Sequence, residues 1–335
     1  MEFSAKLLTV LQLTRMALVF TAISNVLAGL LLRVYLDPRD GGSFTYWHAF
    51  LVAIVAGGLY GFGMSLNDII DRRRDRLLAS HRPLPSGRIG IVAAHVICGS
   101  LALLAVIAAF VFAQLSPRGQ VSLAVVLWCI ALIAFYDLIG KYLVAAGLVA
   151  LGLIRFFLAA VPQPMLLVPW HPLLLFNHVA ILSAVCYVLE RKRPAFTRRH
   201  LLATVGGIVL ANLAVVVVLW QRRTGASFDP RLIADTLALR WTLLYVLAAV
   251  AGFAVVSVLI LRRERERRAA GQQLMLAGLL WLIVYDAAFA LAYVGRMQAT
   301  VLIALLPASY LSVQVMRWWS KLLQLGQKPQ FIRAR

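Results

Sequence analysis

Three of the chain's thirteen acidic residues lie close together at the end of a long apolar stretch. They are Asp68, Asp71 and Asp75, and Asn67 directly precedes them. On an α-helix the three carboxylates fall within an arc of roughly 60°, with the amide about 40° further round the same face. Carboxylates so placed repel one another unless a cation neutralises them, and hard oxygen ligands suit Mg²⁺ bridging to a phosphate. The spacing therefore predicts a Mg²⁺ site made by these four residues.

The alternative interpretation is a solvated helix end whose acids pair with neighbouring arginines, namely Arg72, Arg73, Arg74 and Arg76. The place of the motif at the mouth of an apolar segment favours the metal site. After the last aspartate, Pro83 and Pro85 break the helix and Gly87 allows the chain to reverse. This turn is expected to hold Arg82 and Arg88 close to the acids.

The elements that position these residues are membrane helices. The chain is 62% hydrophobic and 14% charged, with a mean hydropathy of +0.86, far outside the range of a soluble domain. We therefore predict an all-α, polytopic transmembrane bundle of about 9–10 spans. The apolar runs lie at 14–33, 45–66, 90–113, 121–139, 143–161, 172–189, 201–220, 239–261, 273–294 and 299–317. Residues 1–320 are expected to form a single domain and 321–335 a basic cytoplasmic tail.

The net charge of +20 follows the predicted topology. With the N-terminus inside, 24 of the 33 basic residues fall in inner segments, eight in outer loops and one, Arg155, within a span. This distribution argues against a nucleic-acid partner and fits the positive-inside rule with both termini cytoplasmic. We expect an integral protein of the cell (inner) membrane, whose inner rim attracts anionic lipids and a diphosphate.

An Asn-Asp-x-x-Asp-x-x-x-Asp helix end followed by Arg-Pro-Leu-Pro-Ser-Gly resembles the first signature of the UbiA superfamily of intramembrane prenyltransferases. The pattern stands here at Asn67 to Asp75 and Arg82 to Gly87. The segment FYDLIGKYLVAAGLVALGLIR is similar to that family's Tyr-x-x-x-x-Lys segment, with Tyr136 and Lys141. The resemblance implies a helical bundle around a lipid-open central cavity that binds an isoprenyl diphosphate through Mg²⁺ held by two acidic motifs.

The sequence departs from that family in two respects. Where the second acidic motif is expected, Glu190 is the one acid within CYVLERKRPAFTRRH, among five basic residues. The family usually has nine helices, whereas ten spans are counted here. Glu190 is therefore expected to serve at most as a single ligand across the cavity.

Cleaving an allylic diphosphate produces a carbocation and a highly charged leaving group, which metal and basic side chains must stabilise. We assign catalytic roles to Asp68, Asp71 and Lys141, with Lys141 contacting the diphosphate. Arg82, Asn67 and Glu190 are expected to bind substrate. Tyr136 either stacks against the cation or hydrogen-bonds the acceptor, or it anchors the helix at the membrane interface.

Two polar residues inside spans have two interpretations each. Arg155 either contacts a phosphate or acceptor, or forms an ion pair with an acid such as Asp137 or Asp286. Asn25 is either a helix-packing residue or a substrate-binding residue. For Asp286 we expect a structural role.

The sequence thus predicts a Mg²⁺-dependent prenyltransferase, which transfers an isoprenyl group from its diphosphate to a small hydrophobic, aromatic acceptor. The degenerate second motif leaves open a family member that binds a lipid diphosphate or a partner without prenyl transfer. A small-molecule transporter is the third alternative, although buried charge within the spans is sparse.

Overall fold

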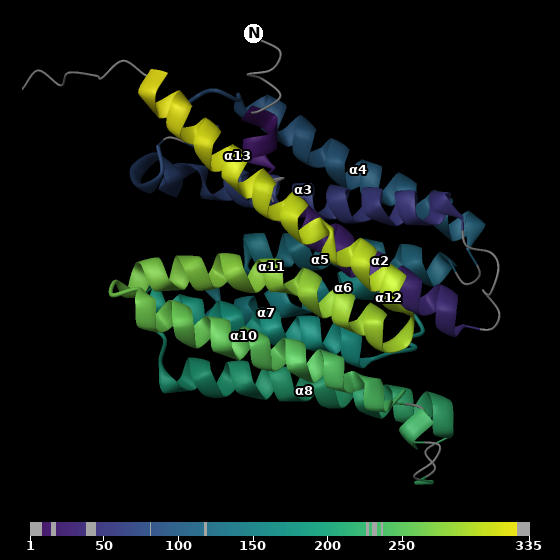
Figure 1. Ribbon diagram of the computed structural model, residues 1–335. Helices are drawn as coiled ribbons and strands as arrows, with labels where there is room; N and C mark the ends of the chain where they lie inside the picture. Colours follow the sequence, from purple (N-terminus) through teal and green to yellow (C-terminus); the bar gives the residue numbers. More distant parts are fainter. Residues whose placement is uncertain are drawn as a thin grey trace, which may run out of the picture.

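The computed structural model describes residues 9–14, 18–37, 45–80, 82–116, 119–225, 228–229, 233–235 and 237–326. Helices dominate these ranges (Figure 1). They are α2 (Val19–Leu36), α3 (Tyr46–Leu78), α4 (Ile91–Leu115), α5 (Gly119–Leu138), η2 (Gly140–Tyr142), α6 (Val144–Ala160), α7 (Trp170–Leu189), α8 (Arg198–Thr224), η3 (Trp241–Leu243), α10 (Leu244–Arg263), α11 (Arg267–Tyr293), α12 (Arg296–Ile303) and α13 (Leu305–Gly326).

Within the described residues, nine helical segments are long and apolar enough to cross a membrane, and α6 is a shorter apolar helix of 17 residues. The last segment, Arg296–Met316, joins α12 to the first part of α13. Together they match the ten predicted apolar runs, so the all-α, polytopic fold class is confirmed. The first part of the predicted tail, up to Gly326, belongs to helix α13. Residues 327–335 and 1–8 lie outside the described residues.

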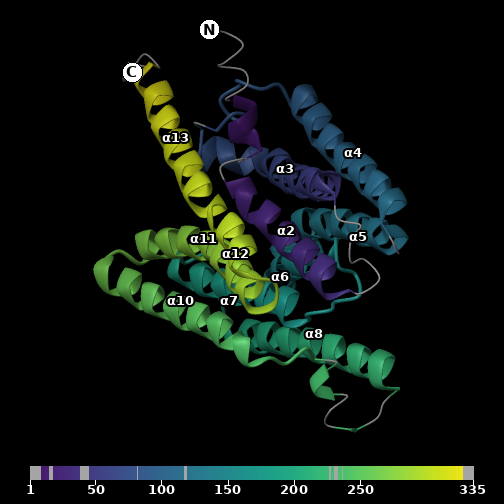
Figure 2. The same cartoon turned by 45° about the vertical axis from the view of Figure 1, so that its right-hand side comes forward.

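Helices α2, α6, α7 and α11 form the centre of the bundle. Helix α6 packs along α7, and α11 contacts α2, α7 and α10. Helices α3 and α4 pack side by side next to α2, while α8 and α10 lie at the opposite edge (Figure 1). Helix α13 runs obliquely across α2, as Figure 2 shows from a second direction.

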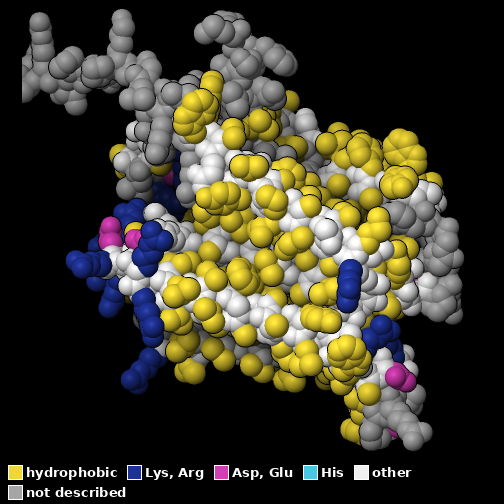
Figure 3. Space-filling view, in the orientation of Figure 1, with side chains coloured by type: hydrophobic (Ala, Val, Ile, Leu, Met, Phe, Trp, Pro, Cys, Tyr) yellow, Lys and Arg dark blue, Asp and Glu magenta, His cyan; other side chains and the backbone are white. Residues whose placement is uncertain are grey.

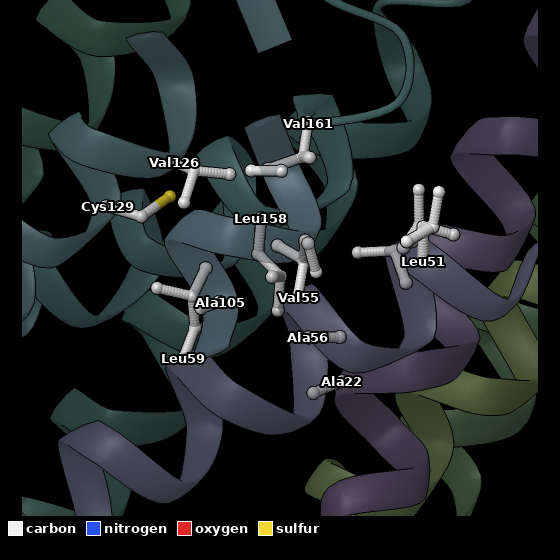
Figure 4. Close-up of a cluster of buried hydrophobic side chains, with 14 of the residues drawn as sticks. Ala22, Leu51, Val55, Ala56, Leu59, Ala105, Val126, Cys129, Leu158 and Val161 are labelled. Atoms are coloured by element: carbon white, nitrogen blue, oxygen red, sulfur yellow. The ribbon is translucent and has the colours of Figure 1, made fainter. Parts of the chain in front are cut away.

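The largest buried apolar cluster joins α3 to its neighbours (Figure 4). Val55 and Leu59 of α3 pack with Ala105 of α4, Val126 of α5 and Leu158 of α6. The glycines of α3 serve this packing: a Cβ atom on Gly58 would lie 2.8 Å from the Leu101 carbonyl oxygen, and one on Gly61 would lie 2.9 Å from the Leu101 side chain. These small residues therefore let α3 approach α4 closely. The close packing fixes the position of α3, which carries the acidic motif.

The surface divides into an apolar side and charged ends. Apolar side chains cover the flank of the bundle, and Lys and Arg gather at the end where α10 joins α11 (Figure 3). On α8 and α10, exposed residues such as Leu210, Val217, Leu247 and Val255 face outward. A lipid environment solvates such a flank, whereas water would not.

Gly29 of α2 offers a direct test of the central packing. A Cβ atom there would lie 2.5 Å from the Ala159 carbonyl oxygen and 2.9 Å from the Pro162 ring, and the backbone of α6 cannot easily yield. Gly29→Ala is expected to lower the free energy of unfolding by about 1–3 kcal/mol through overpacking. Thermal unfolding of the purified protein in detergent measures this. Gly99→Ala on α4, where a Cβ meets open space, is the control and should not destabilise; an equally stable Gly29→Ala protein would contradict the packing.

Candidate active site

The three aspartates of the motif lie on one face of α3 near its C-terminal end. Asp68, Asp71 and Asp75 are 4%, 6% and 3% exposed, so all three carboxylates are withdrawn from solvent. Buried carboxylates need partners that neutralise their charge. The structure supplies these partners from the segment after α3 and from the segment between α5 and α6.

Arg82 bridges two of the acids. Its Nη1 atom lies 2.5 Å from Asp75 Oδ2 and 3.7 Å from Asp68 Oδ1. The turn that carries it is anchored, because Leu84 and Ile89 are buried with Leu13. The prediction that this turn holds Arg82 against the acids is therefore consistent with the geometry.

Arg88, the second basic residue of the same turn, points elsewhere. Its Nη1 donates to Gln12 Oε1 at 2.9 Å and its Nε donates to Ser86 Oγ at 3.1 Å. Burial lowers the pKa of the Arg88 guanidinium from its usual value. Its hydrogen bonds tie the turn to the start of the chain, so it supports the turn that presents Arg82.

Lys141 reaches the third acid from the other side. Its Nζ donates to Asp71 Oδ1 at 2.8 Å, and Arg74 donates to Asp71 Oδ2 at 3.0 Å. Lys141 lies in the short 3-10 helix η2, which packs tightly because a Cβ atom on Gly147 would be 2.6 Å from the Gly140 carbonyl oxygen. Two segments far apart in the sequence thus converge on the acidic face of α3.

The donor set fits Mg²⁺ in chemistry. No group of three or more His, Cys, Asp or Glu side chains is gathered as a metal cage in the ranges that the structure describes. Mg²⁺ needs no such cage, because it is commonly held by one or two carboxylates together with substrate phosphates and water. In the described arrangement Arg82, Lys141 and Arg74 balance the carboxylates instead, which agrees in part with the alternative of acids paired with nearby arginines.

The remaining predicted residues at this end lie on α3, on α5 and directly after α7. Asn67 and Tyr136 are half-buried, on α3 and α5. Glu190 ends α7, where its Oε2 lies 3.2 Å from Lys192 Nζ and its side chain packs against Gly271 of α11. The contacts of Glu190 are therefore with its own loop and α11, and a role as a ligand across the cavity stays a prediction.

Deeper in the bundle, the two ambiguous polar residues meet. Arg155 donates to Asn25 Oδ1 at 3.2 Å and to Thr21 Oγ1 at 3.4 Å. Asn25 in turn donates to Asp286 Oδ2 at 2.8 Å. Arg155 thus reaches Asp286 through Asn25 and not as the direct ion pair that one interpretation predicted. Asn25 of α2 therefore has both expected features. It links α2 to α6 and α11, and it contacts Arg155.

Sequence reasoning missed two members of this network. His171 Nε2 lies 2.8 Å from Asp286 Oδ1, and Gln163 Nε2 lies 3.3 Å from His171 Nδ1. Both side chains are almost fully buried. A histidine at the start of an apolar helix was the available signal, since a polar side chain buried in a bundle needs partners.

Comparisons with known proteins bear on the fold. No known family profile matches the chain, and no curated protein sequence matches it. Among solved structures it is similar to a digeranylgeranylglyceryl phosphate synthase in membranes, at 17% identity over 87% of this chain and 99% of that one, with a TM-score of 0.55. Structures of a UbiA homologue from Archaeoglobus fulgidus match at a TM-score of 0.44. One is bound to GPP and Mg²⁺ (15% identity, 90% of this chain, 99% of that one) and one to DMAPP and Mg²⁺ (14%, 90% and 98%).

The architecture defines the class: an integral membrane protein built as a polytopic helical bundle. Its fold is similar to that of the digeranylgeranylglyceryl phosphate synthase structure.

Proposed function

We propose that this chain is a Mg²⁺-dependent membrane prenyltransferase, which moves an isoprenyl group from its diphosphate to a small hydrophobic, aromatic acceptor. The observation that carries the proposal is the convergence of Arg82 and Lys141 on three buried aspartates of α3. The fold shared with a membrane-embedded synthase supports it. The basic end of the bundle would face the cytoplasm, with the apolar flank in the cell membrane.

The described residues are suited to binding a diphosphate. The aspartates Asp68, Asp71 and Asp75, with Asn67 beside them, would hold Mg²⁺. The metal, when bound, would neutralise the phosphate oxygens and stabilise the departing diphosphate. Lys141 and Arg82 already contact these carboxylates. Once the carboxylates coordinate a cation, the two basic side chains are placed to donate to phosphate oxygens.

The proposed transfer has two steps. The C1–O bond of the allylic diphosphate breaks, and its electron pair leaves with the diphosphate, which leaves an allylic cation. A nucleophilic carbon of the acceptor then forms a bond to C1 and loses a proton to solvent or to the released diphosphate. The apolar bundle excludes water from the cation, and Tyr136 is proposed to face it with its ring.

Replacement of Lys141 tests the diphosphate contact. Lys141→Met removes one positive charge that lies 2.8 Å from Asp71, and it is expected to weaken binding of a prenyl diphosphate by roughly 10–100-fold. Equilibrium binding of a labelled prenyl diphosphate to the purified protein with Mg²⁺ measures the effect.

The control for this variant is Arg265→Met, which removes an exposed charge between α10 and α11. The control should bind as the wild type does. Equal binding by Lys141→Met and the wild type would remove Lys141 from the proposed site.

A second candidate function is binding of a lipid diphosphate without transfer. It is favoured by the basic segment after α7, where Glu190 is paired with Lys192 and no acidic motif follows. Incubation with Mg²⁺ and a panel of labelled prenyl diphosphates separates the two candidates. Mg²⁺-dependent release of diphosphate supports the transferase. Tight binding of the prenyl diphosphate, with no release of diphosphate in the presence of any acceptor tested, supports the second candidate.

A further inference from the structure

Helices α7 and α8 meet through a pair of amides. Asn177 donates to Asn212 Oδ1 at 2.9 Å, and Asn212 donates to Asn177 Oδ1 at 2.8 Å. Each amide thus satisfies polar groups that lipid could not. The pair fixes the point at which the two helices touch, and the faces that carry it can be followed from there toward the loop 190–197 that joins the helices.

Between this amide pair and the loop, one face of α7 is uncovered. Ile181, Val185 and Val188 follow Asn177 by four, eight and eleven residues, so they lie on the same side of the helix. Their side chains are 53%, 40% and 50% exposed, although α7 packs against α6 and α11 along its other faces. The side of α7 that meets α8 at Asn177 is therefore open nearer the loop.

The matching face of α8 is uncovered as well. Leu201 and Val205 precede Asn212 by eleven and seven residues, which places them on the side of α8 that carries the amide, and they are 50% and 48% exposed. This part of α8 packs instead on α6, where a Cβ atom on Gly207 would lie 2.9 Å from the Val149 side chain. The two faces touch at the amides and are open on both helices nearer the loop. They therefore border an apolar groove that widens toward the loop.

Basic side chains surround the wide end of this groove (Figure 3). Ile260, near the end of α10, packs in one cluster with Cys186 and Leu189 of α7, so the basic end of α10 adjoins the loop. Six of the seven basic residues are arginines, and in the part of the chain that the structure describes none of the six forms an ion pair with a carboxylate. The seven exposed residues are Arg191, Lys192, Arg193, Arg198, Arg199, Arg262 and Arg263.

The loop itself is held in place. The Tyr187 hydroxyl donates to the Pro194 carbonyl oxygen at 2.7 Å, and the Thr197 side chain caps the start of α8. Arg198 and Arg199 then occupy the first turn of α8, where the helix dipole disfavours cations. An anion bound beside them offsets that cost, because it interacts favourably with both guanidinium groups and with the helix N-terminus.

We propose that this groove binds one anionic phospholipid, whose phosphodiester lies among the arginines and whose acyl chain lies between α7 and α8. Both parts of the surface fit such a molecule, because hydrocarbon solvates the apolar walls and basic clusters between membrane helices bind anionic headgroups. A soluble anion would contact the charged end alone. The arginines nearest the acidic motif differ, since Arg74 and Arg82 are already paired with aspartates. The lipid site does not depend on the proposed transfer reaction.

The headgroup is tested by native mass spectrometry of the full-length protein, released from neutral micelles that hold equal amounts of phosphatidylglycerol and phosphatidylcholine. The first lipid that the wild type retains is expected to be phosphatidylglycerol, with a preference of about tenfold. Arg198→Gln/Arg199→Gln should reduce this preference to about twofold. Arg73→Gln/Arg76→Gln removes two exposed charges from the end of α3, and this matched control should keep the wild-type preference.

The groove is tested with a bulky side chain. Val205→Trp fills the space beside α7 and should lower retention of phosphatidylglycerol about fivefold, whereas Leu210→Trp, on a different and exposed face of α8, should retain it as the wild type does. The exposed arginine pair keeps the test decisive if Val205→Trp does not fold. Glycerol 3-phosphate, which has the phosphate and no acyl chain, should not displace the lipid.

Four results would overturn the proposal. They are a wild type without headgroup preference, equal loss of that preference in the α8 and α3 double variants, equal retention by the two tryptophan variants, and displacement of the lipid by glycerol 3-phosphate.

Discussion

Asp71→Asn is expected to reduce Mg²⁺-dependent release of diphosphate by about 10³-fold, comparable to the loss of a strong electrostatic contact in an active site. Asp71 is contacted from two sides, because Lys141 and Arg74 bond to different oxygens of its carboxylate. The asparagine keeps the shape of the side chain and removes its charge. It therefore weakens the proposed metal site and also releases Lys141 from its position.

The measurement is single-turnover release of labelled diphosphate from a prenyl diphosphate, with and without Mg²⁺. Chelation of Mg²⁺ should reduce the wild-type rate to the level of Asp71→Asn, and Mg²⁺ should not rescue the variant. Glu264→Gln, which removes an acid bonded to Gln273 at the α10–α11 end, is the matched control. Full prenyl transfer by Asp71→Asn would refute the assignment of the acidic motif as the metal site.

Asp286→Ala is expected to produce the largest loss of stability, about 3 kcal/mol, because it leaves buried donors on Asn25 and His171 without an acceptor. A single hydrogen bond within a membrane bundle is worth only about 0.6 kcal/mol on average. The larger value applies here because the side chain is fully buried and holds three helices together: α2, α7 and α11.

Unfolding of the detergent-solubilised protein, followed by circular dichroism, measures this loss. Asp286→Asn keeps one acceptor oxygen and should lose about half as much. Glu266→Ala, at the exposed start of α11, should change stability by less than about 0.5 kcal/mol. A wild-type unfolding curve for Asp286→Ala would show that this buried polar network does not support the bundle.

The order and number of the membrane helices could be predicted because lipid imposes a simple rule. A helix that spans the hydrocarbon must be apolar over about twenty residues, and this requirement is visible in the chain itself. The motif from Asn67 to Asp75 was equally accessible, because helical periodicity alone places its acids on one face. Arg82 could be placed near them because Pro83 and Pro85 break the helix directly after the acids and Gly87 allows the chain to reverse.

Contacts between distant segments could not be predicted in this way. Lys141 was expected at a diphosphate, but that it bonds Asp71 follows from how η2 is packed between α5 and α6. For Arg155 the sequence left a substrate contact and an ion pair equally open. In the described residues the structure shows no direct ion pair with Asp286, since Asn25 stands between Arg155 and Asp286, and the substrate contact stays a prediction.

By itself, the sequence determined that this is an all-α membrane protein with an acidic motif at a basic end, because hydropathy, charge asymmetry and helical spacing are local properties of the chain. Only the tertiary structure decided which basic residues face those acids, and that His171 and Gln163 complete a buried polar network that reaches Arg155. The physical reason is that such partners lie on different helices, and their distances depend on packing, to which every helix in the bundle contributes.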